Sequence, residues 1–98
     1  MKPEVTERLL RLQIQIVSET KNHYLLARDN CLALLERTES GLGSLGSTGF
    51  MTESGLCYLC WKQDRAILVG KSVEKPASPS EVDSIQQFSR DLKAALVL

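Results

Sequence analysis

Residues 10–16 read LRLQIQI, and the predicted fold depends on how this stretch is interpreted. Apolar and polar residues alternate strictly, which is typical of a half-buried β-strand. The flanking residues instead continue a helical spacing, because Val5, Leu9, Leu12 and Ile16 recur at intervals of four, three and four. Two structures are therefore open for this stretch: part of a long helix, or a strand at 10–17.

The helical interpretation predicts one long helix from Pro3 to about Glu39. Proline suits the first turn of a helix, and Gly41 is a natural left-handed stop. A second apolar stripe keeps helical spacing as far as Leu35. In the alternative, the strand at 10–17 is followed by a helix from Glu19 to Glu39 that Ser18 caps.

A glycine-rich segment and a β-hairpin are predicted next. Residues 41–49 read GLGSLGSTG, the composition of a flexible connector. Two apolar runs, 56–61 and 66–69, then flank a turn at Gln63-Asp64, so we predict a β-hairpin at about 56–73. Both of its faces are apolar, and an isolated hairpin of this kind is not stable in water. It must therefore be covered by other elements or by a second chain.

The C-terminal segment carries the clearest helix signal. Residues 78–81 read SPSE, a capping box with proline at the first helical position. We predict an amphipathic helix from about 79 to 97 whose apolar stripe is formed by Val82, Ile85, Phe88, Leu92 and Leu96. The whole chain, residues 1–98, is predicted to be a single domain of the α+β class.

Composition argues against several classes of partner. Twelve basic residues balance twelve acidic ones. The sequence contains no basic stripe of the kind that binds nucleic acid. The N-terminus lacks the apolar run of a signal peptide, and no apolar run approaches the length of a membrane span. Three cysteines, an odd number, suit a reducing compartment. We expect a cytoplasmic protein that does not bind membranes, with nucleic acid an improbable ligand.

Three motifs could carry chemistry, and each has a plainer explanation. Cys57 and Cys60 form a C-x-x-C, but inside a strand they face opposite sides, and His23 and Cys31 do not complete a recognisable metal site. Residues 41–46 match G-x-G-x-x-G with the order of strand and helix reversed. His23 is the sole histidine and no nucleophile turn accompanies it. We predict no enzymatic activity, no cofactor and no metal.

A protein-interaction module that self-associates is the predicted function. A helix of about 55 Å would outreach a domain of about 30–35 Å, and its apolar residues lie on more than one face. Such uncovered surface usually marks an interface. The predicted interface residues are Leu9, Leu12, Ile16, Tyr24, Leu25, Leu32 and Trp61. A protein partner or a homodimer is expected, as for an adaptor, small chaperone or regulatory subunit.

Two alternative functions remain open. Tyr58 and Trp61 lie beside Lys62 and Arg65 on the predicted hairpin, where they could stack single-stranded bases. The C-x-x-C at 57–60 could instead belong to a small metal or thiol protein.

Overall fold

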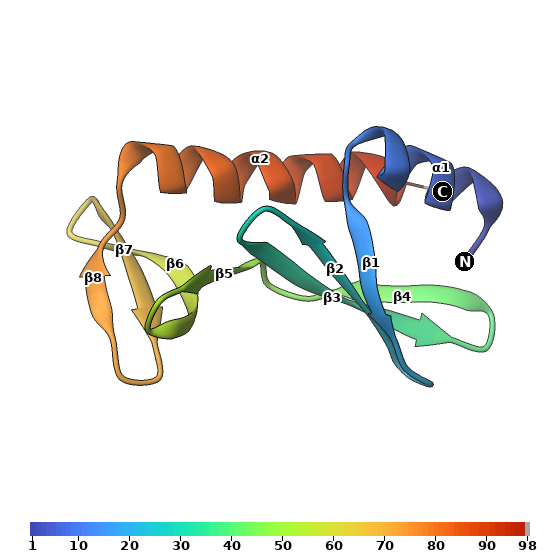
Figure 1. The fold of residues 1–98 in the computed structure, drawn as a ribbon, viewed down its shortest axis with the longest axis horizontal. Coiled ribbons are helices and arrows are strands. Elements are labelled where there is room, and N and C mark those ends of the chain that lie inside the picture. The colour runs from blue at the N-terminus through green and yellow to red at the C-terminus, as the bar shows by residue number, and fades with distance from the viewer. Residues whose placement is uncertain (98) are drawn as a thin grey trace.

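The computed structural model describes residues 1–97 of the chain. Within these residues a short helix, α1 (Pro3–Arg11), begins the fold and a longer one, α2 (Pro79–Ala95), ends it. Both helices lie on the same side of a sheet, and α2 runs along the long axis of the molecule (Figure 1). The strands between them are β1 (Gln15–Glu19), β2 (His23–Arg28), β3 (Cys31–Thr38), β4 (Gly41–Leu45), β5 (Gly49–Thr52), β6 (Gly55–Lys62), β7 (Arg65–Gly70) and β8 (Glu74–Pro76).

The strands form one antiparallel sheet in which consecutive strands pair with each other, except β4 and β5, which both pair with β3. The order is β1-β2-β3-β5-β6-β7-β8, and β4 also pairs with β3. β3 has room for both, because Cys31 and Leu32 pair with β5 while residues 35–38 pair with β4. The sheet therefore has two halves, β1–β4 and β5–β8, that meet where β3 pairs with β5.

The predicted α+β fold with a long N-terminal helix is wrong. The helix ends at Arg11, Gln13 adopts a positive φ of 60°, and the chain then enters β1. The alternative is also incorrect in its bounds, since the strand begins at Gln15 instead of residue 10 and residues 19–39 contain strands instead of a helix. Leucine and alanine favour helices intrinsically, but pairing with neighbouring strands overrides this preference.

The predicted flexible connector at 41–49 is also wrong. Residues 41–45 form β4 on the edge of β3, and Gly49 begins β5. Gly41 has a φ of 136°, which favours glycine after the turn from β3. Gly49 is needed for another reason, because a Cβ atom there would lie 2.7 Å from Cδ1 of Leu56. These glycines allow the chain to pass from one half of the sheet to the other.

The hairpin predicted at about 56–73 is confirmed as β6 and β7. Gln63 and Asp64 form the turn with positive φ values of 51° and 63°, the conformation of a type I′ turn. β8 extends the hairpin by a third strand, which the sequence did not indicate.

The C-terminal helix is confirmed together with its capping box. The Ser78 hydroxyl accepts a hydrogen bond from the Glu81 N–H at 3.2 Å, and the Glu81 carboxylate accepts one from the Ser78 N–H at 2.8 Å. Ile85, Phe88 and Leu92 are buried as predicted, whereas Val82 and Leu96 are only half-buried. The observed helix ends at Ala95, two residues before the predicted end at 97.

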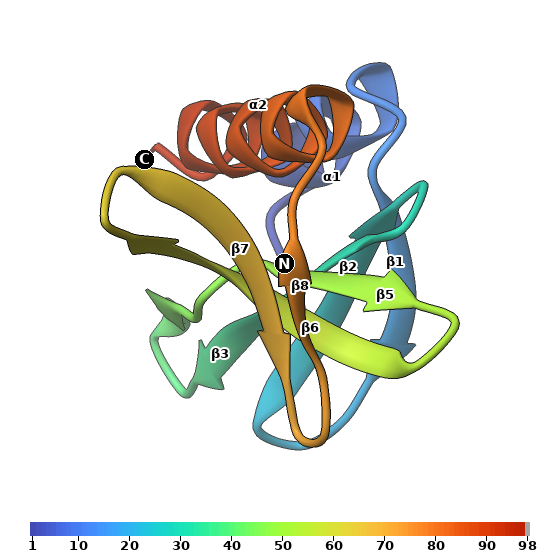
Figure 2. The ribbon, with the colours of Figure 1, turned by 90° about the vertical axis from the view of Figure 1, so that its left-hand side faces the viewer.

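The helices and one face of the sheet enclose a single core, and Figure 2 shows both helices on that face. Phe88 and Leu92 of α2 are fully buried, as are Leu26 of β2 and Leu68 of β7. α2 therefore packs on strands of both halves. Arg8 of α1 donates hydrogen bonds to the carbonyls of Ala95 and Val97, at 2.8 and 3.1 Å, and so caps the C-terminal end of α2.

The cap and the stripe of α2 make separable contributions to stability. Ser78→Ala should lower the free energy of unfolding by about 1 kcal/mol, and Leu92→Ala by about 2–5 kcal/mol. Leu10→Ala is the control, because Leu10 is 74% exposed and its loss should change stability by less than about 0.5 kcal/mol. Urea unfolding followed by circular dichroism measures all three. Equal midpoints for Leu92→Ala and Leu10→Ala would contradict the packing of α2.

Candidate interaction surface

Alternation along the strands places apolar side chains on the face of the sheet turned away from the helices. Tyr24 and Leu26 of β2, and Ala33 and Leu35 of β3, point into the core. The residues that alternate with them along each strand therefore point to the opposite face. β6 behaves in the same way around buried Cys57. We call the apolar set on the uncovered side the open face: Leu25, Leu32, Leu34, Leu56 and Tyr58.

The open face spans the junction between the two halves of the sheet. Leu32 of β3 pairs with Gly49, Gly49 pairs with Tyr58, and Tyr58 pairs with Val69, which makes one row across four strands. Because Gly49 has no side chain, the row is interrupted in its middle. The Leu56 side chain occupies the space beside Gly49 in which a Cβ atom would otherwise lie.

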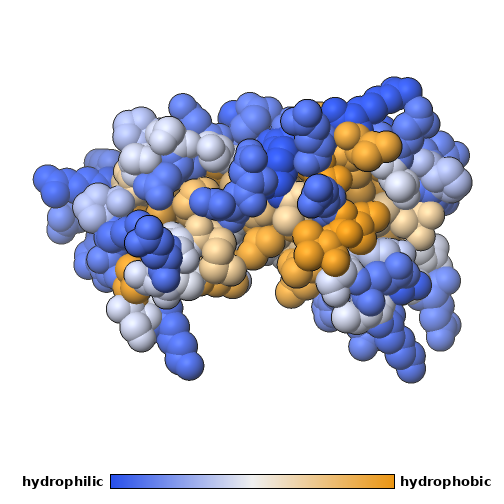
Figure 3. Space-filling model, in the orientation of Figure 1, coloured by the Kyte–Doolittle hydropathy of each residue, from blue (hydrophilic) through white to orange (hydrophobic). Residues whose placement is uncertain are grey.

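A shallow apolar hollow of about 370 Å³ lies at this junction. Open-face side chains line it together with Gly46, Ser47 and Gly49, and none of these residues is charged. In the side view of Figure 3, apolar side chains reach the surface in the middle of the molecule, while hydrophilic residues dominate both ends. The hollow therefore offers contact area for apolar groups but no ionisable group for chemistry.

The structure separates the seven predicted interface residues into three environments. Leu9 and Tyr24 are buried in the core of the chain itself, and Leu12 is half-buried against that core. Leu25 and Leu32 belong to the open face. Ile16 and Trp61 are exposed elsewhere, Ile16 on the edge strand β1 and Trp61 near the tip of the β6–β7 hairpin.

Leu34, Leu56 and Tyr58 belong to the open face but were absent from the prediction. Their position depends on strand register, which only the turns could have indicated. Asn22 and the pair Asp29-Asn30 are residues typical of turns, and they separate short apolar runs at regular spacing. With those turns assigned, alternation would have placed Leu25, Leu32 and Leu34 together.

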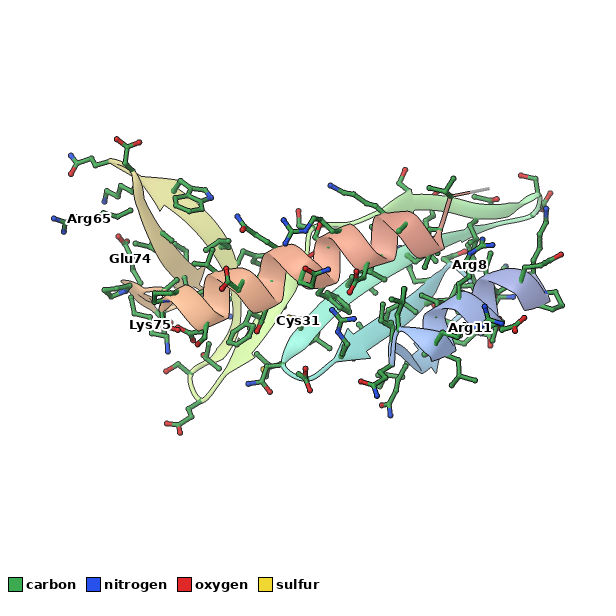
Figure 4. All side chains as sticks on the ribbon, turned by 90° about the horizontal axis from the view of Figure 1, so that it is seen from above. Arg8, Arg11, Cys31, Arg65, Glu74 and Lys75 are labelled. Carbon is green, nitrogen blue, oxygen red and sulfur yellow. The ribbon has the colours of Figure 1, made fainter. Side chains whose placement is uncertain are left out.

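The cysteines do not form a shared site. Cys57 is buried and Cys60 is exposed, on opposite faces of β6, and all three cysteines are free. Cys31 is buried under α2, where its thiol lies 3.6 Å from the Ser84 carbonyl oxygen (labelled in Figure 4). Burial raises the pKa of the Cys31 thiol, so it stays protonated near neutral pH. Among residues 1–97, no three His, Cys, Asp or Glu side chains are grouped as metal ligands.

His23 and the glycine-rich motif are also placed outside any constellation of reactive groups. His23, expected on a helix, is the exposed first residue of β2 next to a turn. The G-x-G-x-x-G segment forms β4 and the start of the passage to β5, so it does not precede a helix.

An ion pair on the helix side has a structural role. Arg28 donates hydrogen bonds to Asp91 at 2.9 Å and to the Leu12 carbonyl at 3.0 Å. Burial alone would raise the pKa of Asp91, but hydrogen bonds from Arg28 and Gln87 and the charge of Arg28 hold this pKa below its usual value. The pair therefore ties β2 and the end of α1 to α2.

Comparison with known proteins adds no family to this geometry. No family model matches the chain, and no curated protein or solved structure shows significant similarity to it. Within the described residues, neither helix is long and apolar enough to cross a membrane.

The three thiols should differ in reactivity. Cys60 should react rapidly with a thiol reagent under native conditions, and Cys31 and Cys57 should react only on unfolding, because both are buried. Cys60→Ser should therefore abolish the fast phase while leaving the slow phases unchanged. Two fast thiols in the native wild-type protein would contradict the burial of Cys31 or Cys57.

Proposed function

We propose that this chain is a non-enzymatic protein-interaction module that self-associates, with a second copy of the chain covering the open face. The observation that carries the proposal is the open face itself. It is apolar, it spans both halves of the sheet, and no element of residues 1–97 covers it. An apolar face of this kind usually packs against another protein surface.

The surface area of the chain supports a second copy as the occupant. The accessible surface is 6693 Å² for a mass of 10.9 kDa, whereas a compact monomer of that mass exposes about 5,600 Å². The excess, about 1,100 Å², exceeds the roughly 800 Å² that each partner contributes to a standard interface. The radius of gyration, 14.1 Å, likewise exceeds the value of about 12.6 Å for a compact chain of this length.

Charge and shape also favour self-association. Equal numbers of acidic and basic residues give a formal net charge of zero, so two copies do not repel each other through their net charge. Two sheets can pack face to face at a spacing of about 10 Å, with side chains of both inner faces interdigitated. A twofold axis near the hollow would bring Leu34 and Tyr58 of one copy onto the open face of the other.

The alternative functions receive less support from the geometry. Tyr58 and Trp61 lie on opposite faces of β6, so they do not form one platform on which successive bases could stack. Cys57 and Cys60 are separated in the same way, which disfavours a metal or thiol site. The proposal places the protein in the cytoplasm, a compartment that keeps free thiols such as these reduced.

Self-association should depend on the open face and not on exposed leucines in general. Leu34→Glu should weaken association by at least about tenfold, because a charge would be buried without a partner. Leu10→Glu is the matched control, because Leu10 is 74% exposed on α1, on the opposite side of the molecule from the open face. Sedimentation equilibrium at micromolar concentration measures both.

A wild-type protein that stays monomeric throughout this range would refute the proposal. Equal weakening by both substitutions would show that the copies meet on another surface.

A further inference from the structure

One segment of β6 lacks a neighbouring strand on one side. β5 pairs with β6 from Gly55 to Tyr58 only, because the chain before Gly49 turns away to form β4 on β3. β7 pairs with β6 from Cys57 to Lys62. Within residues 1–97, the part of β6 from 59 to 62 therefore has β7 on one side and no strand on the other.

The turns on either side of β6 fix the directions of its backbone groups. Both are two-residue turns, which make Thr52–Gly55 and Lys62–Arg65 the first hydrogen-bonded pairs of their hairpins. Since bonded positions alternate, Cys60 and Lys62 bond to β7, whereas Leu59 and Trp61 direct their N–H and C=O groups to the empty side. In the described chain these outward groups meet no hydrogen-bond partner.

The other free edges carry features that hinder strand addition. β8 is three residues long and directs Pro76, which has no N–H, outward. Irregular register interrupts β1 between Ile16 and Ser18, and β3–β4 pairing between Leu35 and Arg37. The edge at 59–62 contains no proline, glycine or bulge. Within the described sheet, this edge therefore lacks the features that hinder strand addition at β1, β4 and β8.

We infer that an extended segment of a partner protein adds as a strand to β6 at residues 59–62. Its backbone would satisfy the outward groups of Leu59 and Trp61, as in strand addition by other peptide-binding domains. Trp61 is 60% exposed and would be covered by an apolar or aromatic residue of the segment.

Charge complementarity specifies a second feature of the partner. Lys62 and Arg65 are directly opposite each other across the hairpin, an unfavourable pairing of like charges. The Lys62 Nζ atom lies 3.5 Å from Oε1 of Glu74. Arg65 forms no ion pair in the described residues and projects from the end of the molecule (Figure 4). An acidic residue in the added strand beside Lys62 would relieve this repulsion. The partner segment is therefore extended, with an apolar residue at Trp61 and an acidic residue near Lys62.

Trp61→Pro and Trp61→Val form a matched pair of variants for this site. Proline removes the outward N–H of Trp61 but no hydrogen bond to β7, so the hairpin should persist. Valine removes the indole ring but keeps the N–H. The probe is a displayed library of short random peptides, selected on the full-length chain.

Enriched peptides should combine alternating apolar residues with an acidic residue. They should bind Trp61→Pro at least about tenfold more weakly than Trp61→Val. In wild-type protein, hydrogen exchange of the Leu59 and Trp61 amides should be fast in the free chain and slowed at least about tenfold by a bound peptide. This wild-type measurement stands even if Trp61→Pro fails to fold.

Three results would overturn the inference: no enriched peptide, equal binding to both variants, or protection at other amides only. Protection of Leu59 and Trp61 by self-association alone, without peptide, would assign the edge to a second copy and would also refute it. The inference is independent of the dimer at the open face, since a chain that stays monomeric could still bind a strand at β6.

Discussion

The packing of α2 on the sheet is the interaction on which the rest of the structure depends. Phe88 and Leu92 are fully buried against strands that include Leu26 in one half of the sheet and Leu68 in the other. The direct joint between the halves is the short pairing of β3 with β5, at two pairs of residues. A continuous helix across both halves therefore holds them in one orientation, and Arg28–Asp91 and Arg8 fix its C-terminal half.

This arrangement also explains why the chain exposes apolar surface. Two helices totalling 26 residues, nine in α1 and seventeen in α2, lie on one face of the sheet. In a small chain, few residues are left to cover the other face. The apolar residues of the open face thus cost free energy in an isolated monomer and become favourable when a second copy covers them. The face and the β6 edge are separate surfaces, one suited to a broad apolar contact and the other to a single extended strand.

Local signals in the sequence were sufficient for the β6–β7 hairpin and for α2, but not for the strands β1 to β5 or for β8. The capping box at 78–81 and the turn at Gln63-Asp64 each act through neighbouring residues, so the helix and hairpin could be predicted. Residues 15–38 contain apolar side chains on both faces of their strands, and such a pattern satisfies a helical period as well as an alternating one. Strand pairing across the sheet decided between them, and pairing is not encoded in any single stretch.

The same limit applied to the candidate interface. Leu25 and Leu32 were predicted from their apolar character, whereas Leu9 and Tyr24, chosen on the same ground, are buried in the core. Which leucines reach the surface depends on register, and register depends on turns at Lys21-Asn22 and Asp29-Asn30 that contain no glycine. Leu34, Leu56 and Tyr58 converge only once both halves of the sheet are assembled.

An isotope-filtered NOE experiment on a mixture of ¹³C-labelled and unlabelled chains tests most directly whether the open face is covered by a second copy. We expect intermolecular NOEs at the methyl groups of Leu25, Leu32 and Leu34 and at the ring of Tyr58, and none at the methyl groups of Leu10. Intermolecular NOEs confined to Leu10 and other residues of the helix side, or none at concentrations where the chains associate, would contradict the account.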